Sequence, residues 1–169
     1  MNTLERREGA KNPFLPVLSD AVNRASEKVL FVLMLLMIAV TTGQVIFRFL
    51  FDALTWSEEL SCFLLVLSSL VGAAIAFKRG SHIAVTFVVL KLPEKAQKIV
   101  AVIVNLLGIA FFLIVAYYGA VLMKTEFGQT TPAMQISMAW IYVMYPVMGS
   151  VIVLHLLAGI SGIIRGRQS

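Results

Sequence analysis

The side chains best suited to chemistry in this chain are one arginine and two adjacent acids. Arg48 lies near the end of an apolar run, and Glu58 and Glu59 open the next run. An arginine at such a depth requires a carboxylate or a lipid headgroup beside it. Adjacent residues on a helix diverge by ~100°, so one acid can pair with Arg48 while the other points elsewhere. The spacing predicts an outward-facing polar lock or docking point, with a snorkelling arginine beside a charged helix cap as the alternative.

Two polar side chains lie inside apolar runs at similar expected depth. Asn105 falls ~7 Å and His155 ~6 Å to the inner side of the midpoint of its run, at 1.5 Å per residue. We expect a hydrogen bond between them. No chain of ionisable groups continues the pair, so a structural role is favoured over a proton relay.

Metal and haem chemistry are not favoured. His82 follows Lys78 and Arg79 at the expected inner surface of the membrane, which is not the depth of His155. A haem that spans the membrane needs axial ligands that face each other at one depth. The single cysteine, Cys62, excludes a metal site built from cysteines. We therefore expect no metal and no cofactor.

The elements that must position these side chains are four long apolar runs, at residues 29–51, 60–77, 99–123 and 139–164. Each run is long enough to cross a hydrocarbon core of ~30 Å. With 59% hydrophobic residues and a mean hydropathy of +0.90, the chain carries more apolar side chain than a soluble domain of this size buries. The sequence predicts an all-α integral membrane domain over residues 29–165. So few charges inside it indicate a non-catalytic protein that works with a partner.

The segment before the first run, residues 1–28, is polar and contains Pro13 and Pro16. After the prolines, apolar residues recur at helical spacing, which predicts a short amphipathic helix on the inner membrane surface. Extension of the first membrane helix explains the same pattern, and the sequence leaves both interpretations open.

Basic residues are distributed unevenly along the chain. Twelve of the 14 lysines and arginines lie in the N-terminal segment, the second connection or the C-terminus, and only Arg48 and Lys124 lie on the other side. The positive-inside rule then predicts cytoplasmic termini. The net charge of +5 does not indicate nucleic acid, because the basic residues flank helix ends, where they meet membrane lipids.

Small residues recur along the second run. Ser68, Gly72 and Ala76 are spaced by four residues and so share one helix face. Such a strip lets two helices approach closely. It serves either packing within this chain or docking of a partner's helix.

Several short motifs resemble those of a known family of membrane proteins. They are Arg48-Phe49-Leu50-Phe51, Trp56-Ser57-Glu58-Glu59-Leu60, Gly72-Ala73 and Lys78-Arg79-Gly80-Ser81-His82-Ile83. Over roughly residues 20–165 the chain resembles the DctQ-like small membrane subunit of tripartite ATP-independent periplasmic (TRAP) transporters. The family often has Tyr and Asp where this chain has Phe49 and Thr86.

The resemblance implies a subunit of the bacterial inner membrane that supports a much larger transport subunit. That large subunit would carry an organic acid, such as a C4-dicarboxylate or a sialic acid, together with sodium. A periplasmic binding protein would deliver the substrate. Trp56, Glu58 and Glu59 then become candidates for partner contacts. The competing interpretations are a membrane anchor of a redox complex and a small four-helix multidrug exporter.

Overall fold

The computed structural model describes residues 14–50, 54–79 and 93–164. Helices dominate this part of the chain: α1 (Phe14–Leu50), α2 (Thr55–Lys78), α4 (Glu94–Thr125), α5 (Met138–Tyr142) and α6 (Met144–Ile164). Within the described residues, β-type pairing is limited to one isolated bridge, between Thr130 and Ser137. The expected all-helical fold is confirmed.

Within the described ranges, four stretches are long and apolar enough to cross a membrane: Leu15–Leu50, Thr55–Lys78, Ala96–Thr125 and Met138–Ile163. They match the four apolar runs of the sequence to within one residue at the C-terminal ends of the first and last runs, and they extend most of the runs into polar residues. The last stretch is made by α5 and α6 together. At 1.5 Å per residue the 37 residues of α1 measure ~55 Å, well beyond a hydrocarbon core of ~30 Å.

The first helix runs without interruption from Phe14 to Leu50. Residues 14–28 are therefore the beginning of α1, and no separate amphipathic helix lies before the membrane helix in the described chain. Pro16 falls in the first helical turn, where its missing N–H leaves no hydrogen bond unmade. Ser19 and Ser26 are buried, so this part of α1 packs into the bundle instead of lying flat on a membrane surface.

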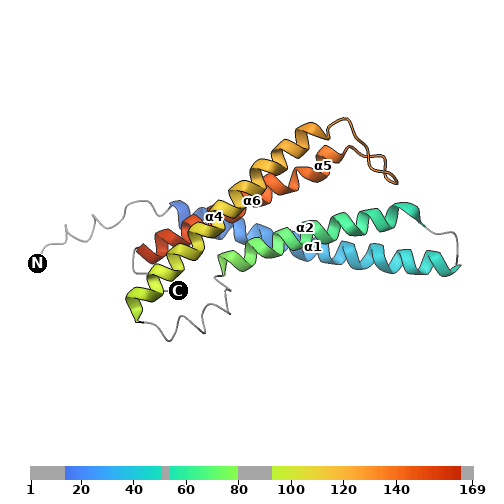
Figure 1. Ribbon diagram of the computed structural model, residues 1–169. Helices are drawn as coiled ribbons and strands as arrows, with labels where there is room; N and C mark the ends of the chain where they lie inside the picture. The colour runs from blue at the N-terminus through green and yellow to red at the C-terminus, as the bar shows by residue number, and fades with distance from the viewer. Residues whose placement is uncertain (1–13, 51–53, 80–92, 165–169) are drawn as a thin grey trace, which may run out of the picture.

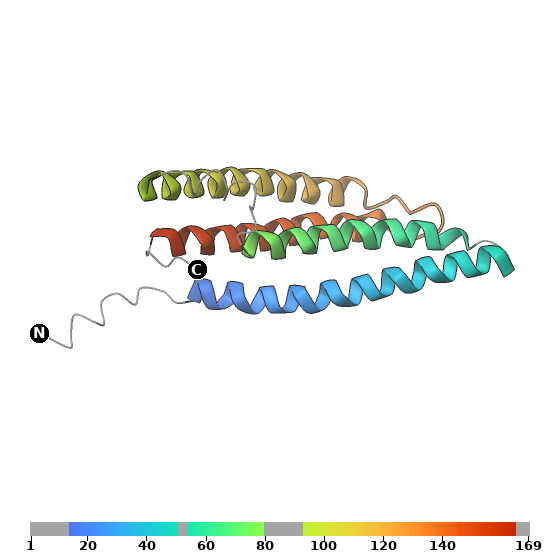
Figure 2. The ribbon, with the colours of Figure 1, turned by 90° about the horizontal axis from the view of Figure 1, so that it is seen from below.

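The helices form two antiparallel pairs, α1 with α2 and α4 with α6, and the pairs meet through α2 and α6. Figure 2 shows α1 on one side and α4 on the other, with α2 and α6 between them. The pairs diverge toward one end (Figure 1), which holds the connection between α4 and α5. We call this end the loop end, and the opposite end, where α1 begins and α6 finishes, the terminal end.

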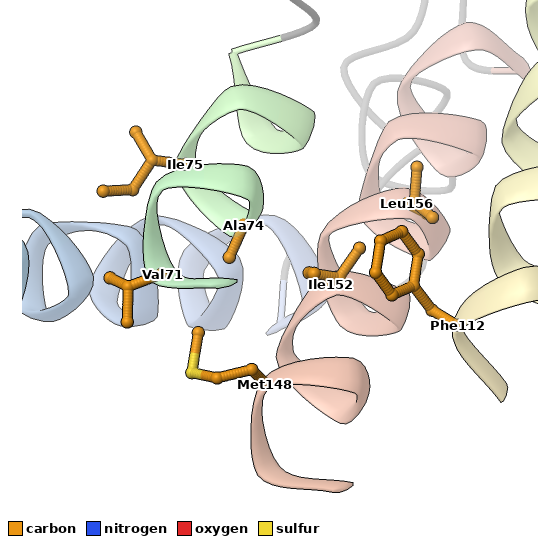
Figure 3. Close-up of a cluster of buried hydrophobic side chains, with 7 residues drawn as sticks. All are labelled: Val71, Ala74, Ile75, Phe112, Met148, Ile152 and Leu156. Carbon is orange, nitrogen blue, oxygen red and sulfur yellow. The ribbon is translucent and has the colours of Figure 1, made fainter. Parts of the chain in front are cut away.

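The buried core lies where α2 meets α6 and α4 (Figure 3). Its side chains come from three helices, and Ile152 and Leu156 of α6 are almost completely buried. Phe112 of α4 meets Phe77 of α2 edge to face, with ring centroids 5.2 Å apart. The full cluster consists of Val71, Ala74, Ile75, Phe112, Met148, Ile152 and Leu156. Most other large apolar side chains of α1 and α4 point outward, as expected for a protein surrounded by lipid.

Glycines allow α4 to approach α6 closely. A Cβ atom at Gly119 would lie 2.6 Å from Cβ of Tyr145 and 2.9 Å from Cδ of Pro146. A Cβ atom at Gly149 would lie 3.1 Å from Cβ of Ala116. The α5–α6 break therefore rests directly on the backbone of α4.

We predict that Gly119→Ala destabilises the bundle, because the new methyl group meets atoms close to the backbone that cannot move aside. Overpacking of this kind costs about 1–3 kcal/mol. Gly43→Ala is the matched control, since a Cβ atom there meets nothing within 4 Å. Reversible unfolding of the purified protein in mixed detergent measures both. Equal stability of the two variants would contradict the close approach.

Candidate functional site

Glu59 joins the start of α2 to the far pair of helices. Its Oε2 accepts hydrogen bonds from the backbone N–H of Ala133 at 2.8 Å and of Met134 at 3.1 Å. These partners lie 74 and 75 residues further along the chain. Carboxylate acceptors make stronger hydrogen bonds than neutral ones. Glu59 thus closes the loop end, where the two helix pairs diverge.

The connection that Glu59 holds has an ordered structure of its own. Thr131 is fully buried, its N–H donates to the carbonyl of Ile136 at 2.8 Å, and its hydroxyl accepts from the Ile136 N–H at 3.3 Å. Gln135 takes a left-handed backbone conformation with φ of 57°. Ser137 then caps α5 by accepting from the Ala139 N–H. The segment is a tight turn that presents two N–H groups to one carboxylate.

The predicted lock between Arg48 and an acid is not formed within the described residues. Arg48 is exposed near the end of α1, and no ion pair joins it to Glu58 or Glu59. Glu59 instead turns toward the connection after α4, where two N–H groups donate to its Oε2. Sequence spacing pointed to the neighbour in the chain, whereas the actual partner comes from the other helix pair.

Glu58 and Trp56 lie on the exposed surface beside this contact. Glu58 is exposed, and Trp56 is 42% exposed. An open groove of about 370 Å³ runs between the start of α2 and the turn that Glu59 holds. Glu58, Cys62, Pro132 and Met138 are among its lining residues. The loop end therefore offers a carboxylate and an indole beside a shallow, mostly apolar depression.

At the terminal end, His155 of α6 pairs with α1 and not with Asn105. Its Nδ1 shares a hydrogen bond of 2.8 Å with the Ser19 hydroxyl, and both side chains are buried. Asn105 donates instead to the carbonyl of Ala101, one turn back on its own helix. The predicted Asn105–His155 hydrogen bond is therefore wrong. Their expected depths are similar, but depth does not determine which way each side chain points around its helix axis.

Two ion pairs join α1 to the end of α2. Lys78 contacts Asp20 at 2.7 Å, and Arg79 contacts Glu27 at 2.8 Å. The sequence singled out Lys78 and Arg79 but not their partners. Seven residues separate the two acids, so both lie on one face of a helix, and this spacing was the available signal. His82, the third residue expected here, lies outside the described residues.

Only part of the small-residue strip of α2 packs against the described part of this chain. Ser68 is buried, but Ala76 is exposed. A Cβ atom at Gly72 would meet nothing within 4 Å. Gly72 and Ala76 therefore lie on a face of α2 that the described part of this chain leaves uncovered.

In the described residues, no group of three or more His, Cys, Asp or Glu side chains is placed to hold a metal ion. The polar side chains described above, Glu59 at the loop end and Ser19 and His155 at the terminal end, form hydrogen bonds with other parts of the same chain. Four membrane-crossing helices with polar contacts between helices at each end define a multi-pass membrane protein.

The comparisons with known proteins identify the family. A family model described as "Tripartite ATP-independent periplasmic transporters, DctQ component" matches residues 37–166. This match covers most of the chain, so the chain belongs to the DctQ family of TRAP transporter small permease subunits, which are transport components and not enzymes. The resemblance seen in the sequence is confirmed.

Three relatives show how far the similarity extends. The chain is 44% identical over 84 residues to the sialic acid TRAP transporter small permease protein SiaQ of Vibrio cholerae, a match covering 49% of each protein. It is 28% identical to a putative TRAP transporter small permease protein of Haemophilus influenzae, over 72% of this chain and 74% of that one. It is 27% identical to the isethionate TRAP transporter permease protein DctMQ of Oleidesulfovibrio alaskensis, over 78% of this chain and 22% of that one.

We predict that Glu59→Ala loosens the turn after α4 without unfolding the helices. The N–H groups of Ala133 and Met134 lose their acceptor and should exchange with deuterium several-fold faster. Glu58→Ala is the matched control, because it removes the adjacent, exposed acid. If both variants accelerate exchange equally, the contact does not hold the turn.

Proposed function

We propose that this chain is the fixed support of a sodium-coupled organic acid transporter. A larger membrane subunit would carry the substrate and the sodium, and a periplasmic protein would deliver the substrate. The observation that carries this proposal is the membership of the DctQ family, together with a small-residue face of α2 that this chain does not cover. The DctMQ relative supports a large partner, since this chain corresponds to only 22% of that protein.

The loop end is the proposed contact with the binding protein. Glu58 and Trp56 are exposed there, beside the turn that Glu59 fixes. A rigid turn and an exposed carboxylate present a defined polar surface, which favours correct docking more than it adds affinity. Arg48, exposed near the same end, provides a positive charge to that surface.

The proposed substrate class is a carboxylate or sulfonate of low molecular weight. The names of two relatives support this: one carries sialic acid in its name and one isethionate. Sialic acid is the more strongly supported, because the V. cholerae protein has the higher identity, 44%, over its aligned half. A redox-complex anchor gains no support from any of the three relatives. Uptake of radiolabelled sialic acid and of a C4-dicarboxylate by the whole transporter distinguishes the substrates.

The proposed location is the bacterial inner membrane, with the terminal end in the cytoplasm. The start of α1 and the end of α6 lie at one end of the bundle (Figure 2). Lys78 and Arg79 lie at that end too, because they pair with Asp20 and Glu27 of α1. The distribution of twelve basic residues against two then favours the cytoplasm for that end.

We predict that a single cysteine at Gln129 is labelled from the periplasm in a variant lacking Cys62. A cysteine at Ser169 should react only after the membrane is broken. Both follow from the charge asymmetry. A membrane-impermeant maleimide applied to intact spheroplasts and to lysed cells measures them, and the reverse pattern would overturn the orientation.

We predict that Gly72→Leu reduces recovery of the large subunit when this chain is purified. A leucine fills the space that a close partner helix would occupy, and overpacking costs about 1–3 kcal/mol, up to roughly 100-fold in association. The chain itself should still insert and fold, since no atom of another described segment lies within 4 Å of that Cβ position. Gly43→Leu, at an equally open glycine of α1, is the control. Normal co-purification and uptake with Gly72→Leu would show that this face is not a contact.

A further inference from the structure

The acids near the start of α1 pair with basic side chains of α2. Asp20 and Glu27 are neutralised by Lys78 and Arg79 of α2. Glu27 also accepts a hydrogen bond from the Asn23 amide at 2.9 Å, within α1 itself. The acids of this part of α1 are thus paired.

Two basic side chains of the same helix segment have no ion-pair partner among the described residues. Arg24 and Lys28 are exposed, and among the described residues neither makes an ion pair or a hydrogen bond. They are four residues apart, which places them on one face of α1 and ~6 Å apart along its axis. Glu27 is the acid of this face, and Arg79 already neutralises it, so the face keeps the net positive charge of Arg24 and Lys28.

An open groove lies along that face. Its volume is about 820 Å³, inside the range of ~300–1,000 Å³ that is typical of small-molecule sites. Arg24, Lys28 and Glu27 line its polar side, where the Glu27 carboxylate is held by Arg79. Phe31 and Val32 line it one turn further toward the middle of α1. Phe31 and Val32 are 65% and 60% exposed, so their side chains are open to an apolar ligand.

We propose that this groove binds one anionic phospholipid of the adjacent leaflet. The two cations would hold the phosphodiester, and the upper part of an acyl chain would lie against Phe31 and Val32. Only a lipid presents a negative phosphate and a hydrocarbon chain in this order along the membrane normal. The long stem of Lys28 also allows its ammonium group to reach toward the headgroup layer.

The site differs from the general attraction of basic residues to a membrane surface. General attraction needs charge alone and shows no saturation at one lipid per protein. The groove adds an apolar wall at a fixed distance from the charges. It therefore predicts one retained lipid, with a preference for a negative headgroup, independently of which organic acid the transporter carries.

The test is lipid retention by the purified full-length chain. The protein is reconstituted in nanodiscs of equimolar phosphatidylglycerol and phosphatidylcholine and released into detergent for native mass spectrometry. We expect one phosphatidylglycerol to be retained per chain. Arg24→Gln with Lys28→Gln should lower its retention relative to phosphatidylcholine by about fivefold per cation, roughly 25-fold in all. Arg24→Lys with Lys28→Arg should retain it.

Lys98→Gln is the control for the single variant Lys28→Gln, because it removes the same charge from an exposed lysine near the terminal end that lies on α4. Phe31→Ala with Val32→Ala tests the apolar wall and should lower retention of phosphatidylglycerol while leaving both cations in place. Equal losses for Lys98→Gln and for Lys28→Gln would mean general surface attraction and would overturn the proposal. So would retention of phosphatidylcholine equal to phosphatidylglycerol in the unaltered protein.

Discussion

The arrangement of this subunit depends on the contact between α2 and α6. These two helices lie at the centre of the bundle and link two antiparallel pairs that otherwise share little surface. Lipid tails are as apolar as leucine, so burial of apolar area does not by itself drive membrane helices together. Close packing must do so, and one buried cluster supplies it (Figure 3). Val71, Ala74 and Ile75 of α2 join Met148, Ile152 and Leu156 of α6 and Phe112 of α4 in this cluster.

Polar contacts then fix the relative position and rotation of the helices, which apolar packing alone does not determine. Packed apolar surfaces tolerate sliding and rotation, whereas hydrogen bonds hold only at defined geometry. Ser19 with His155 joins α1 to α6 at one end, and Glu59 with the turn after α4 joins the two pairs at the other. The helix pairs are therefore connected both at the core and at each end, as the proposed role of a fixed support requires.

The sequence was sufficient to predict the membrane-crossing helices, but it did not determine how each helix is rotated about its own axis. Four apolar runs of membrane-spanning length determine four crossing segments, and short motifs around Trp56 and Gly72 were enough to recognise the family. Which side chains meet depends on the angle of each helix about its own axis. Asn105 was paired with His155 because of similar expected depth, yet the two do not bond, and Arg48 was paired with one of the two adjacent acids because of nearness in the chain. Both errors arose because each partner was inferred without knowing which helix faces the side chain in the folded bundle.

The unbroken α1 has a consequence for the order in which the chain assembles as it is made. Asp20 and Glu27 leave the ribosome before Lys78 and Arg79 exist, so the first helix enters the membrane with its acids unpaired. Once α2 is synthesised, Lys78 and Arg79 can neutralise these acids, and α1 and α2 form a first hairpin. The hydrogen bond of Ser19 forms later, because its partner His155 follows 136 residues further along the chain. The last helix to be synthesised therefore closes the bundle against the first, and a truncated product lacks that closing contact.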